Sequence, residues 1–479
     1  MTNPGPGPGA PGSREKTTAK AILISIVAAV GGFLFGFDSS VINGAVTAIE
    51  GEFGLENNPL LSGFAVAVAL LGSAVGAWFA GPAADRYGRV RVMLIAAAAF
   101  AISSVLSGLA FAVWDLILWR FVAGVGIGIA SVIAPAYIAE IAPAHIRGRL
   151  ASLQQMAIVL GIFVALLSDY LLQLGAGGAA EVLFLGAEAW RWMFIVGVIP
   201  AIIYAVLALR IPESPRYLVA KGQNEEAGRV LAQVMGTTVD AVRPKIAEIA
   251  ETLVRETKPS LRDLRGHAGG LRPIVWIGIL LSVFQQFVGI NVIFYYSTTL
   301  WQAVGFSEND SFVASVINSL VNVVSTIVAI LIVDKVGRKP MLLGGSAGMA
   351  VTLTIMAIAF SQSVIAPGAE DPSLPGPWGP IALVAANLYV VSFAVTWGPV
   401  VWVLLGEIFP NWLRAAALAV AAAAQWIANF IVTITFPVLA DFSLSFSYGL
   451  YAAMALISFF FVARFIQETK GKELEDMVG

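Results

Sequence analysis

The chain has 479 residues, of which 58% are hydrophobic and only 12% are charged. A soluble protein of this composition would expose too much apolar surface to stay in solution, so the chain is expected to lie in a lipid bilayer. The absence of cysteine excludes disulfides, thiolate metal sites and cysteine nucleophiles, and two histidines are too few for a metal cluster. We therefore expect no metal and no cofactor, and the net charge of −2 gives no reason to expect a nucleic-acid partner.

Apolar windows of about 20 residues, the length that spans a bilayer, occur twelve times along the chain. The predicted spans are 21–43, 60–82, 92–112, 116–139, 150–174, 191–210, 273–300, 311–333, 341–362, 378–406, 415–437 and 444–465. The predicted fold class is therefore an all-α membrane protein with twelve transmembrane helices. The chain divides into a flexible cytoplasmic tail at 1–20, a six-helix half at 21–210, intracellular amphipathic helices at 211–272, a second six-helix half at 273–467 and a cytoplasmic tail at 468–479.

Lysine and arginine are concentrated in alternate loops, which predicts the orientation of the chain in the membrane. Neither residue occurs in the loops at 44–59, 113–115, 301–310, 363–377 and 438–443. The basic loops share their side with both ends of the chain and with the 211–272 segment, and only Arg120 and Arg191 fall elsewhere. Both termini are therefore predicted to be cytoplasmic, in a bacterial inner or plasma membrane.

Within 211–272, apolar residues recur at helical spacing, for example Ala227, Val230, Leu231 and Val234. This pattern predicts two or three short amphipathic helices against the cytoplasmic face, and the alternative is a plain tether between the halves. The segment lacks nucleotide-binding signatures such as GxxxxGK followed by serine or threonine, which argues against transport driven by ATP.

Two charged motifs occur once in each half. Asp85-Arg-Tyr-Gly-Arg89 matches Asp334-Lys-Val-Gly-Arg338, and Glu140-Ile-Ala-Pro-Ala-His-Ile-Arg147 matches Glu407-Ile-Phe-Pro-Asn-Trp-Leu-Arg414. Duplicated six-span halves are how many secondary transporters form a central site that opens to each side in turn, so the repeat indicates transport. We predict an inner gate whose charges pair between the halves when the cytoplasmic side is closed, formed by Asp85, Arg89, Glu140, Arg147, Arg149, Asp334, Arg338, Glu407 and Arg414. The alternative is that these charges only set the topology.

These repeats resemble the motifs of the major facilitator superfamily, and four further segments resemble its sugar-porter branch. They are Pro212-Glu-Ser-Pro-Arg216, Gln285-Gln-Phe-Val-Gly-Ile-Asn291, Trp397-Gly-Pro-Val-Val-Trp402 and Glu468-Thr-Lys-Gly-Lys472. The resemblance covers residues 21–472 and departs from the family pattern at Gln467, where proline is usual. It implies two pseudo-symmetric six-helix halves and transport of a monosaccharide.

A sugar has hydroxyls that both donate and accept hydrogen bonds and apolar ring faces, so its site needs amides and flat aromatic rings. The spans offer Gln155, Gln285, Gln286, Asn291, Asn322, Gln425, Asn429, Trp402, Trp426 and Phe35. The resemblance implies that six of these hold the hexose or pentose: Gln155, Gln285, Gln286, Asn291, Asn322 and Trp402. It also implies that Tyr295 and Tyr296 form the outer gate. The alternatives are interhelical hydrogen bonding for a single amide and ordinary packing for the tyrosines.

Two charges, Asp38 and Arg120, lie well inside predicted spans, where each costs about 2.5–3.5 kcal/mol on insertion scales. Helices one and four adjoin in the family resembled, so the two residues can pair. A nearby arginine favours the ionised carboxylate and its withdrawal favours the protonated acid, which predicts a proton site that depends on conformation. In the family resembled, sugar–proton symporters have aspartate at this position and animal facilitative glucose carriers have asparagine. The alternative is a purely structural ion pair, and Asp169, nearer the outer end of span five, is expected to be solvated.

Together these features predict import of a monosaccharide with a proton by alternating access. D-glucose is favoured over xylose because Ile162 is apolar where a xylose symporter of the family has glutamine, and galactose and arabinose stay open. The alternatives are an uncoupled sugar facilitator and, from another class, a sugar sensor. No enzymatic activity is expected, because we find no nucleophile–base pair and no metal-binding set.

Overall fold

The computed structural model describes residues 11–141, 147–255, 264–266, 270–365 and 372–469. Within these residues, 12 helical segments are long and apolar enough to cross a membrane, which confirms the predicted fold class. The first half contains α1 (Pro11–Phe53), α2 (Pro59–Tyr87), α3 (Arg89–Gly108), α4 (Val113–Ile141), α5 (Arg147–Ala176), α6 (Ala189–Val196) and α7 (Val198–Ala208). The second half contains α11 (Pro273–Phe287), α12 (Ile290–Tyr295), α13 (Ser297–Gln302), α14 (Glu308–Val336), α15 (Arg338–Phe360), α16 (Trp378–Ser392), η3 (Phe393–Trp397), α17 (Gly398–Ile408), α18 (Asn411–Phe442) and α19 (Leu444–Phe465).

The first helix starts earlier than predicted. Residues 11–20 are helical and not a flexible tail, because α1 begins at Pro11, whereas residues 1–10 lie outside the described part of the chain. Proline is tolerated in the first turn of a helix, where its missing N–H leaves no bond unmade. The alanine, lysine and glutamate that follow have good helix propensity.

Span seven is broken, although the sequence predicts one helix over 273–300. The chain turns at Gly289, whose φ is +84°, and a Cβ there would lie 2.7 Å from the ring of Tyr451. Glycine alone suits both this backbone conformation and the close approach. Asn291 and Tyr295 are therefore carried on α12, separately from α11.

Span ten is also irregular, where one continuous helix was predicted over 378–406. The π-helical segment η3 separates α16 from α17. Such segments are frequent at functional sites.

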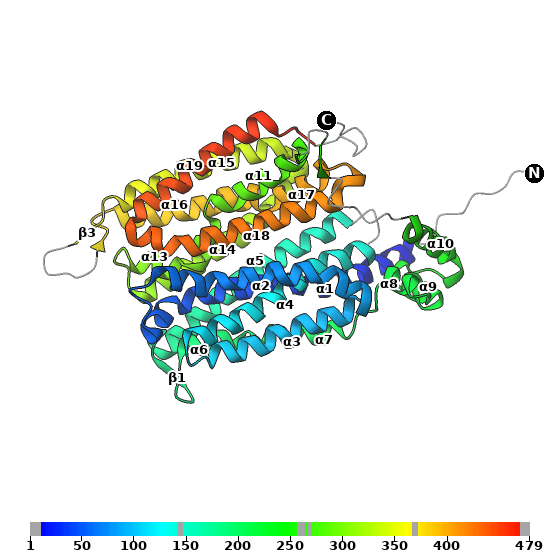
Figure 1. The fold of residues 1–479 in the computed structure, drawn as a ribbon, viewed down its shortest axis with the longest axis horizontal. Coiled ribbons are helices and arrows are strands. Elements are labelled where there is room, and N and C mark those ends of the chain that lie inside the picture. The colour runs from blue at the N-terminus through cyan, green and yellow to red at the C-terminus, as the bar shows by residue number, and fades with distance from the viewer. Residues whose placement is uncertain (1–10, 142–146, 256–263, 267–269, 366–371, 470–479) are drawn as a thin grey trace, which may run out of the picture.

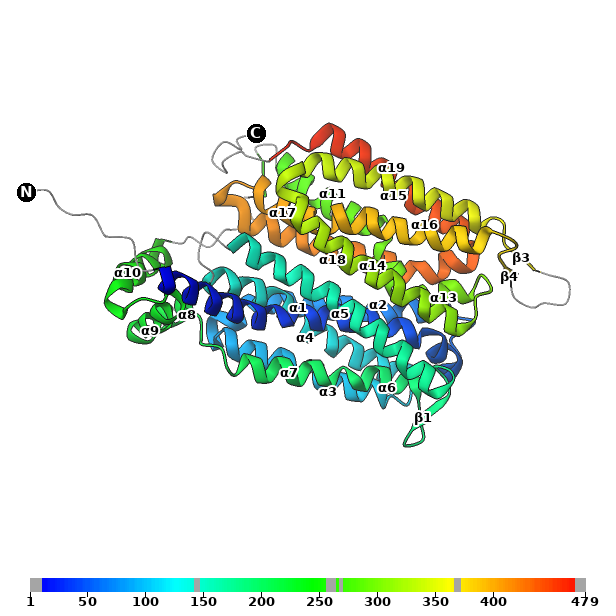
Figure 2. The ribbon, with the colours of Figure 1, turned by 180° about the vertical axis from the view of Figure 1, so that it is seen from behind.

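The two halves are joined along two seams. Figure 1 shows α2 beside α18, and the reverse view in Figure 2 shows α5 beside α14. Within the first half, α1 lies very close to α5: a Cβ on Gly36 would lie 1.9 Å from the carbonyl oxygen of Ile158. Small residues permit this close approach between membrane helices.

The two ends of the bundle differ (Figure 1). The hairpin end, as we call it, carries the short strands β1 (Val182–Phe184), β2 (Ala187–Glu188), β3 (Val364–Ile365) and β4 (Pro372–Ser373). The opposite, terminal end carries the start of α1, Thr469 and the helices α8 (Pro215–Ala220), α9 (Asn224–Met235) and α10 (Val239–Arg255). α9 and α10 pack on each other through Leu231 and Val242, and α9 also packs against α1. These are amphipathic helices in the segment where the sequence predicts them.

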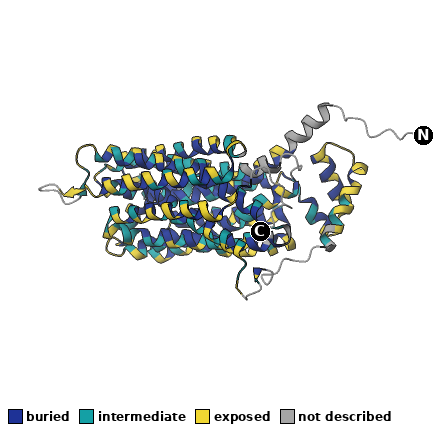
Figure 3. Cartoon of the chain, turned by 90° about the horizontal axis from the view of Figure 1, so that it is seen from above, coloured by how far each residue is buried: buried dark blue, intermediate teal, exposed yellow. Residues whose placement is uncertain are grey.

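Large apolar side chains are exposed on the outside of the bundle, whose exposed positions are yellow in Figure 3. Trp78 is 73% exposed, Leu331 65% and Phe460 61%. A surface of this kind suits contact with lipid hydrocarbon and would be unfavourable in water.

Candidate functional site

The two halves contact each other directly at the hairpin end. The N–H of Thr298 on α13 donates to Oδ1 of Asn43 on α1 at 2.9 Å, and its hydroxyl lies 2.6 Å from the Asn43 carbonyl oxygen. We call this contact the clasp. The N–H of Ala179, just after α5, donates to Glu308 at the start of α14 at 2.7 Å. These bonds hold the seam between the halves closed at this end.

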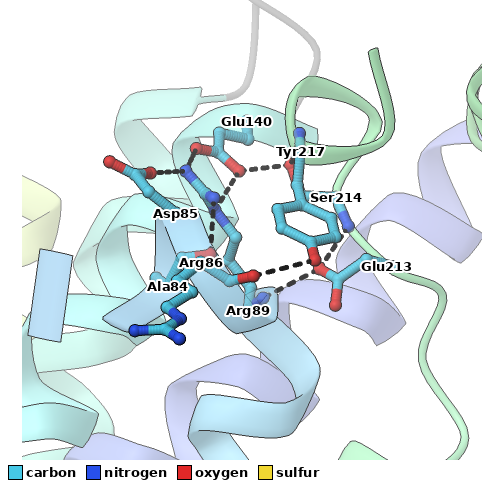
Figure 4. A network of polar contacts seen from close by, with 8 residues as sticks. All are labelled: Ala84, Asp85, Arg86, Arg89, Glu140, Glu213, Ser214 and Tyr217. Atoms are coloured by element: carbon cyan, nitrogen blue, oxygen red, sulfur yellow. Dashed lines mark hydrogen bonds and ion pairs between the residues drawn. The ribbon is translucent and has the colours of Figure 1, made fainter. Parts of the chain in front are cut away.

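At the terminal end, the charged residues predicted as an inner gate form bidentate pairs within each half. Nε and Nη2 of Arg89 bind the carboxylate of Glu140 at 3.1 and 2.9 Å, as Figure 4 shows. The corresponding atoms of Arg338 bind Glu407 at 3.2 and 2.9 Å. Asp85 lies 3.3 Å from Arg89. The side chains of four further predicted gate residues lie outside the described part of the structure: Arg147, Arg149, Asp334 and Arg414.

Two acidic residues complete these networks, and sequence reasoning had identified them only as parts of motifs. Glu213 accepts the N–H groups of Arg89 and Val90 at 2.9 and 3.2 Å, at the start of α3. Glu468 accepts the N–H groups of Arg338 and Lys339, both at 3.0 Å, at the start of α15. Each carboxylate therefore caps a helix N-terminus, where free N–H groups and the helix dipole favour an anion.

The hydroxyl residue that follows each capping acid also has the same role in both halves. Ser214 donates to Glu140 (Figure 4), and Thr469 donates to Glu407 at 2.5 Å. The sequence contains one signal for these networks: an acidic residue followed by a hydroxyl residue comes after the last span of each half, as Glu213-Ser214 and Glu468-Thr469.

The structure brings Asp38 and Arg120 together in the interior. Nη1 of Arg120 on α4 lies 2.8 Å from Oδ1 of Asp38 on α1, and the two residues are 2% and 4% exposed. The cavity beside them, whose lining includes Phe35, Ser39 and Tyr295, has a volume of about 10 Å³. That is room for no more than about one water molecule, so this spot suits a proton and not a sugar.

Three of the predicted amides are linked to one another on span seven. Nε2 of Gln285 donates to the carbonyl oxygens of Trp397 and Gly398, at 3.0 and 3.3 Å, where η3 meets α17. Nε2 of Gln286 lies 3.4 Å from Oε1 of Gln285, and Nδ2 of Asn291 donates to Oε1 of Gln286 at 2.5 Å. Uncharged amides in such a chain can exchange one partner for a sugar hydroxyl, because each offers both donors and an acceptor.

Aromatic residues lie where α1 meets α18 and α12. The rings of Phe35 and Trp426 contact edge to face, with centroids 5.5 Å apart. Tyr295 is 4% exposed, and its hydroxyl lies close to the side chains of Asn429 and Ser39. Tyr295 therefore lies beside both the Asp38–Arg120 pair and a predicted sugar-binding amide.

Tyr296, the second tyrosine predicted for the outer gate, is anchored in the second half. It is 1% exposed, and its hydroxyl donates to the carbonyl oxygen of Thr433 on α18 at 3.0 Å.

The remaining predicted sugar-site residues lie on four different elements. Asn322 on α14 is buried, Gln155 on α5 and Gln425 on α18 are partly buried, and Trp402 on α17 is 43% exposed. Oε1 of Gln425 has no partner among the described residues. These side chains lie on the spans predicted to carry them, and their convergence on one sugar stays a prediction.

The expectation that Asp169 is solvated is wrong. It is 0% exposed, because α1 and α14 cover its position on α5. The sequence shows that Asp169 is near the end of its span, but it does not show that other helices bury this position.

Comparison with known proteins gives one family. The family model for sugar (and other) transporters matches residues 24–478. The chain is 57% identical to the glucose transport protein of Synechocystis sp., over 95% of this chain and 96% of that one. It is 37% identical to the D-xylose-proton symporter of Escherichia coli K12, over 95% and 94%. The solved partially occluded inward open conformation of the xylose transporter XylE from E. coli matches with a TM-score of 0.80 and 35% identity, over 95% of this chain and 100% of that chain.

Proposed function

This chain belongs to the sugar (and other) transporter family, and we propose that it imports a monosaccharide, D-glucose, together with a proton. The observation that carries the proposal is the buried pair of Asp38 and Arg120 inside a twelve-helix transporter bundle. The relative named as a glucose transport protein supports glucose, and the relative named as a proton symporter supports coupling. We propose a cell-membrane location and no enzymatic activity.

In the proposed cycle the halves rock against each other around a sugar bound between them. We place the terminal end in the cytoplasm, because the loops rich in lysine and arginine lie there. The hairpin end then faces outward, and the clasp between Asn43 and Thr298 closes the outer route. The similarity to an inward open conformation of XylE supports this assignment of the state.

The proposed sugar site uses amides and rings from both halves. Its residues are Gln155, Gln285, Gln286, Asn291, Asn322, Trp402, Gln425, Trp426, Asn429 and Phe35. The amides satisfy hydroxyls without bringing a charge, and the rings cover apolar sugar faces. Tyr295 and Tyr296 form the proposed outer gate. The paired charges at the terminal end, with the capping acids, form the proposed inner gate.

Asp38 is the proposed carrier of the coupled proton. With Arg120 at 2.8 Å the ionised form is stabilised, and separation from Arg120 would favour the protonated form. A change in the distance between α1 and α4 during the cycle thus binds or releases a proton.

Uptake of labelled glucose into proteoliposomes tests this function. One charge moving with each sugar through 100 mV contributes about 2.3 kcal/mol, so wild type should accumulate glucose about 50-fold under that potential, and a protonophore should abolish the accumulation. Asp38→Asn should bind sugar but not accumulate it. The control Asp115→Asn should accumulate it normally, because that buried carboxylate accepts hydrogen bonds from the nearby Trp119 side chain and Phe111 N–H and lies away from the Asp38–Arg120 pair.

Two results would contradict the proposal. Wild-type uptake that is indifferent to the protonophore would mean facilitated diffusion, with Asp38 as a structural partner of Arg120. Stronger competition by unlabelled xylose, galactose or arabinose than by unlabelled glucose would reassign the substrate.

A further inference from the structure

Asp169 is a buried acid that the proposed coupling step does not use. Neither oxygen of its carboxyl group has a hydrogen-bond partner among the described residues. A Cβ on Gly44 of α1 would lie 3.0 Å from Oδ2 of Asp169 and 2.9 Å from the ring of Phe312 on α14. The carboxyl group therefore lies where α1 and α5 of the first half meet α14 of the second. Gly44 directly follows Asn43, so this position adjoins the clasp.

On the surrounding helices, the charged residues nearest in sequence to Gly44 and Phe312 are acids, which offer Asp169 no counter-charge. On α1 these are Asp38 and Glu50, each six residues from Gly44. On α14, Glu308 and Asp310 lie within the turn that precedes Phe312.

The cations on the same helices are bound elsewhere or lie far away. Arg120 of α4 binds Asp38, and Arg191 of α6 binds Glu188 and Glu52. Lys335 belongs to the last turn of α14, at the terminal end, and the basic residues of α1 lie before residue 21 at that same end. The ionised form of Asp169 thus has no counter-charge in the described structure, and the backbone N–H of Gly44, which belongs to the interior of α1, gives it at most a weak contact.

A buried carboxylate in this setting is strongly unfavourable, whereas the neutral acid is tolerated far better. We propose that Asp169 binds a proton when the hairpin end closes and returns it to the same side when that end opens. The reason is that Asp169 of α5 and Phe312 of α14 both lie against Gly44 of α1, so separation of the halves withdraws α14 from this site and opens the carboxyl group to water. Asp169 therefore controls closure of the hairpin end, in addition to the coupling step at Asp38 and independently of which sugar is carried.

The expected size of the effect follows from linkage. A proton bound in the closed state and not in the open state changes the ratio of closed to open molecules by up to tenfold per pH unit. Because the closed state binds the additional proton, lowering the pH favours closure and raising it favours opening.

Spin labels on the two halves can measure this ratio without sugar. Cysteines replacing Leu185 and Phe442, which are 81% and 75% exposed, would carry the labels at the hairpin end, and the chain has no other cysteine. Their separation is measured by double electron–electron resonance in nanodiscs between pH 5 and 9. All variants carry Asp38→Asn, so that titration of Asp38 does not contribute.

In this background the closed distance should give way to a longer one as the pH rises. Adding Asp169→Asn, which imitates the protonated acid, should hold the closed distance at every pH. Adding Asp115→Asn instead, a buried acid with hydrogen-bond partners, should leave the pH dependence intact.

Two outcomes would overturn the proposal. One is a distance distribution that does not change with pH in the Asp38→Asn background, a result that needs no folded Asp169 variant. The other is an unchanged pH dependence after Asp169→Asn is added. Failure of glucose–proton uptake would not alter either reading, because no sugar is present.

Discussion

Replacing Asn43 with alanine should open the hairpin end. Thr298 is 2% exposed and lies in the first turn of α13, where its N–H has no acceptor within the helix. The side chain of Asn43 supplies that acceptor at 2.9 Å. The backbone carbonyl of Asn43 is kept in the variant and can still accept from the Thr298 hydroxyl at 2.6 Å.

The magnitude follows from the N–H bond that is lost, because the Thr298 hydroxyl, which also lies 2.9 Å from Oδ1 of Asn43, keeps the backbone carbonyl as its acceptor. Leaving a buried N–H unpaired costs about 1–3 kcal/mol in the closed state. In the open state the same N–H can bind water, so the cost does not apply there. The ratio of closed to open molecules should therefore fall by about 5- to 150-fold.

Double electron–electron resonance between spin labels at positions 185 and 442, at fixed pH and without sugar, would show the shift as a larger population at the longer distance. Thr435→Ala serves as the control, because that hydroxyl donates to the carbonyl oxygen of Ile431 in its own helix at 2.6 Å. A folded Asn43→Ala protein with the wild-type distance distribution would show that the clasp does not hold the halves together.

Two further predictions concern the sugar site and the helix caps. Gln286→Ala should weaken sugar binding in isothermal titration by about 5- to 150-fold, since it leaves a sugar hydroxyl and Asn291 without a partner, and unchanged affinity would remove Gln286 from the site. Glu213→Gln and Glu468→Gln should each reduce the free energy of unfolding by about 1–2 kcal/mol, seen as a lower Tm, because each removes a negative charge from a helix N-terminus. Glu248→Gln, an exposed partner of Lys245, is their control, and equal Tm values would refute the capping role.

The sequence predicts the twelve spans well because hydropathy and length are local properties. The breaks in the spans depend on distant residues and are not local. The sequence alone does not show that span seven breaks at Gly289, because part of the constraint on this residue comes from the ring of Tyr451 on α19. The start of α1 was placed too late because the apolar window begins after the polar first turns of the helix.

In the candidate site too, features set by local properties could be predicted, and features that depend on distant residues could not. The pairing of Asp38 with Arg120 follows from the cost of isolated charges in a membrane, which leaves few acceptable arrangements. The burial of Asp169 could not be predicted, because it depends on the packing of α5 against α1 and against α14 of the other half. A capping role for Glu213 could be expected, because a carboxylate near a helix N-terminus is favourable, but the sequence does not show which helix it caps.

The two halves repeat one network of charged residues but differ in the polar residues at their centres. Gly36-Phe-Asp38 in the first half resembles Gly289-Ile-Asn291 in the second, with a polar residue two positions after a glycine. In the first half that residue is an acid paired with arginine, and in the second it is an amide bonded to Gln286. The proposed cycle thus assigns the proton mainly to one half and most sugar hydroxyls to the other.

Such a division requires a contact through which the two ligands influence each other. Tyr295 meets that requirement, because it belongs to the second half, its hydroxyl lies close to Asn429, and it lines the cavity that holds Asp38 and Arg120. Sugar binding that moves α12 would shift Tyr295 against this pair, and a change in the pair would act back on the sugar through the same side chain. By linkage the two effects must be equal in free energy, so one tyrosine at the seam is enough to make proton binding and sugar binding depend on each other.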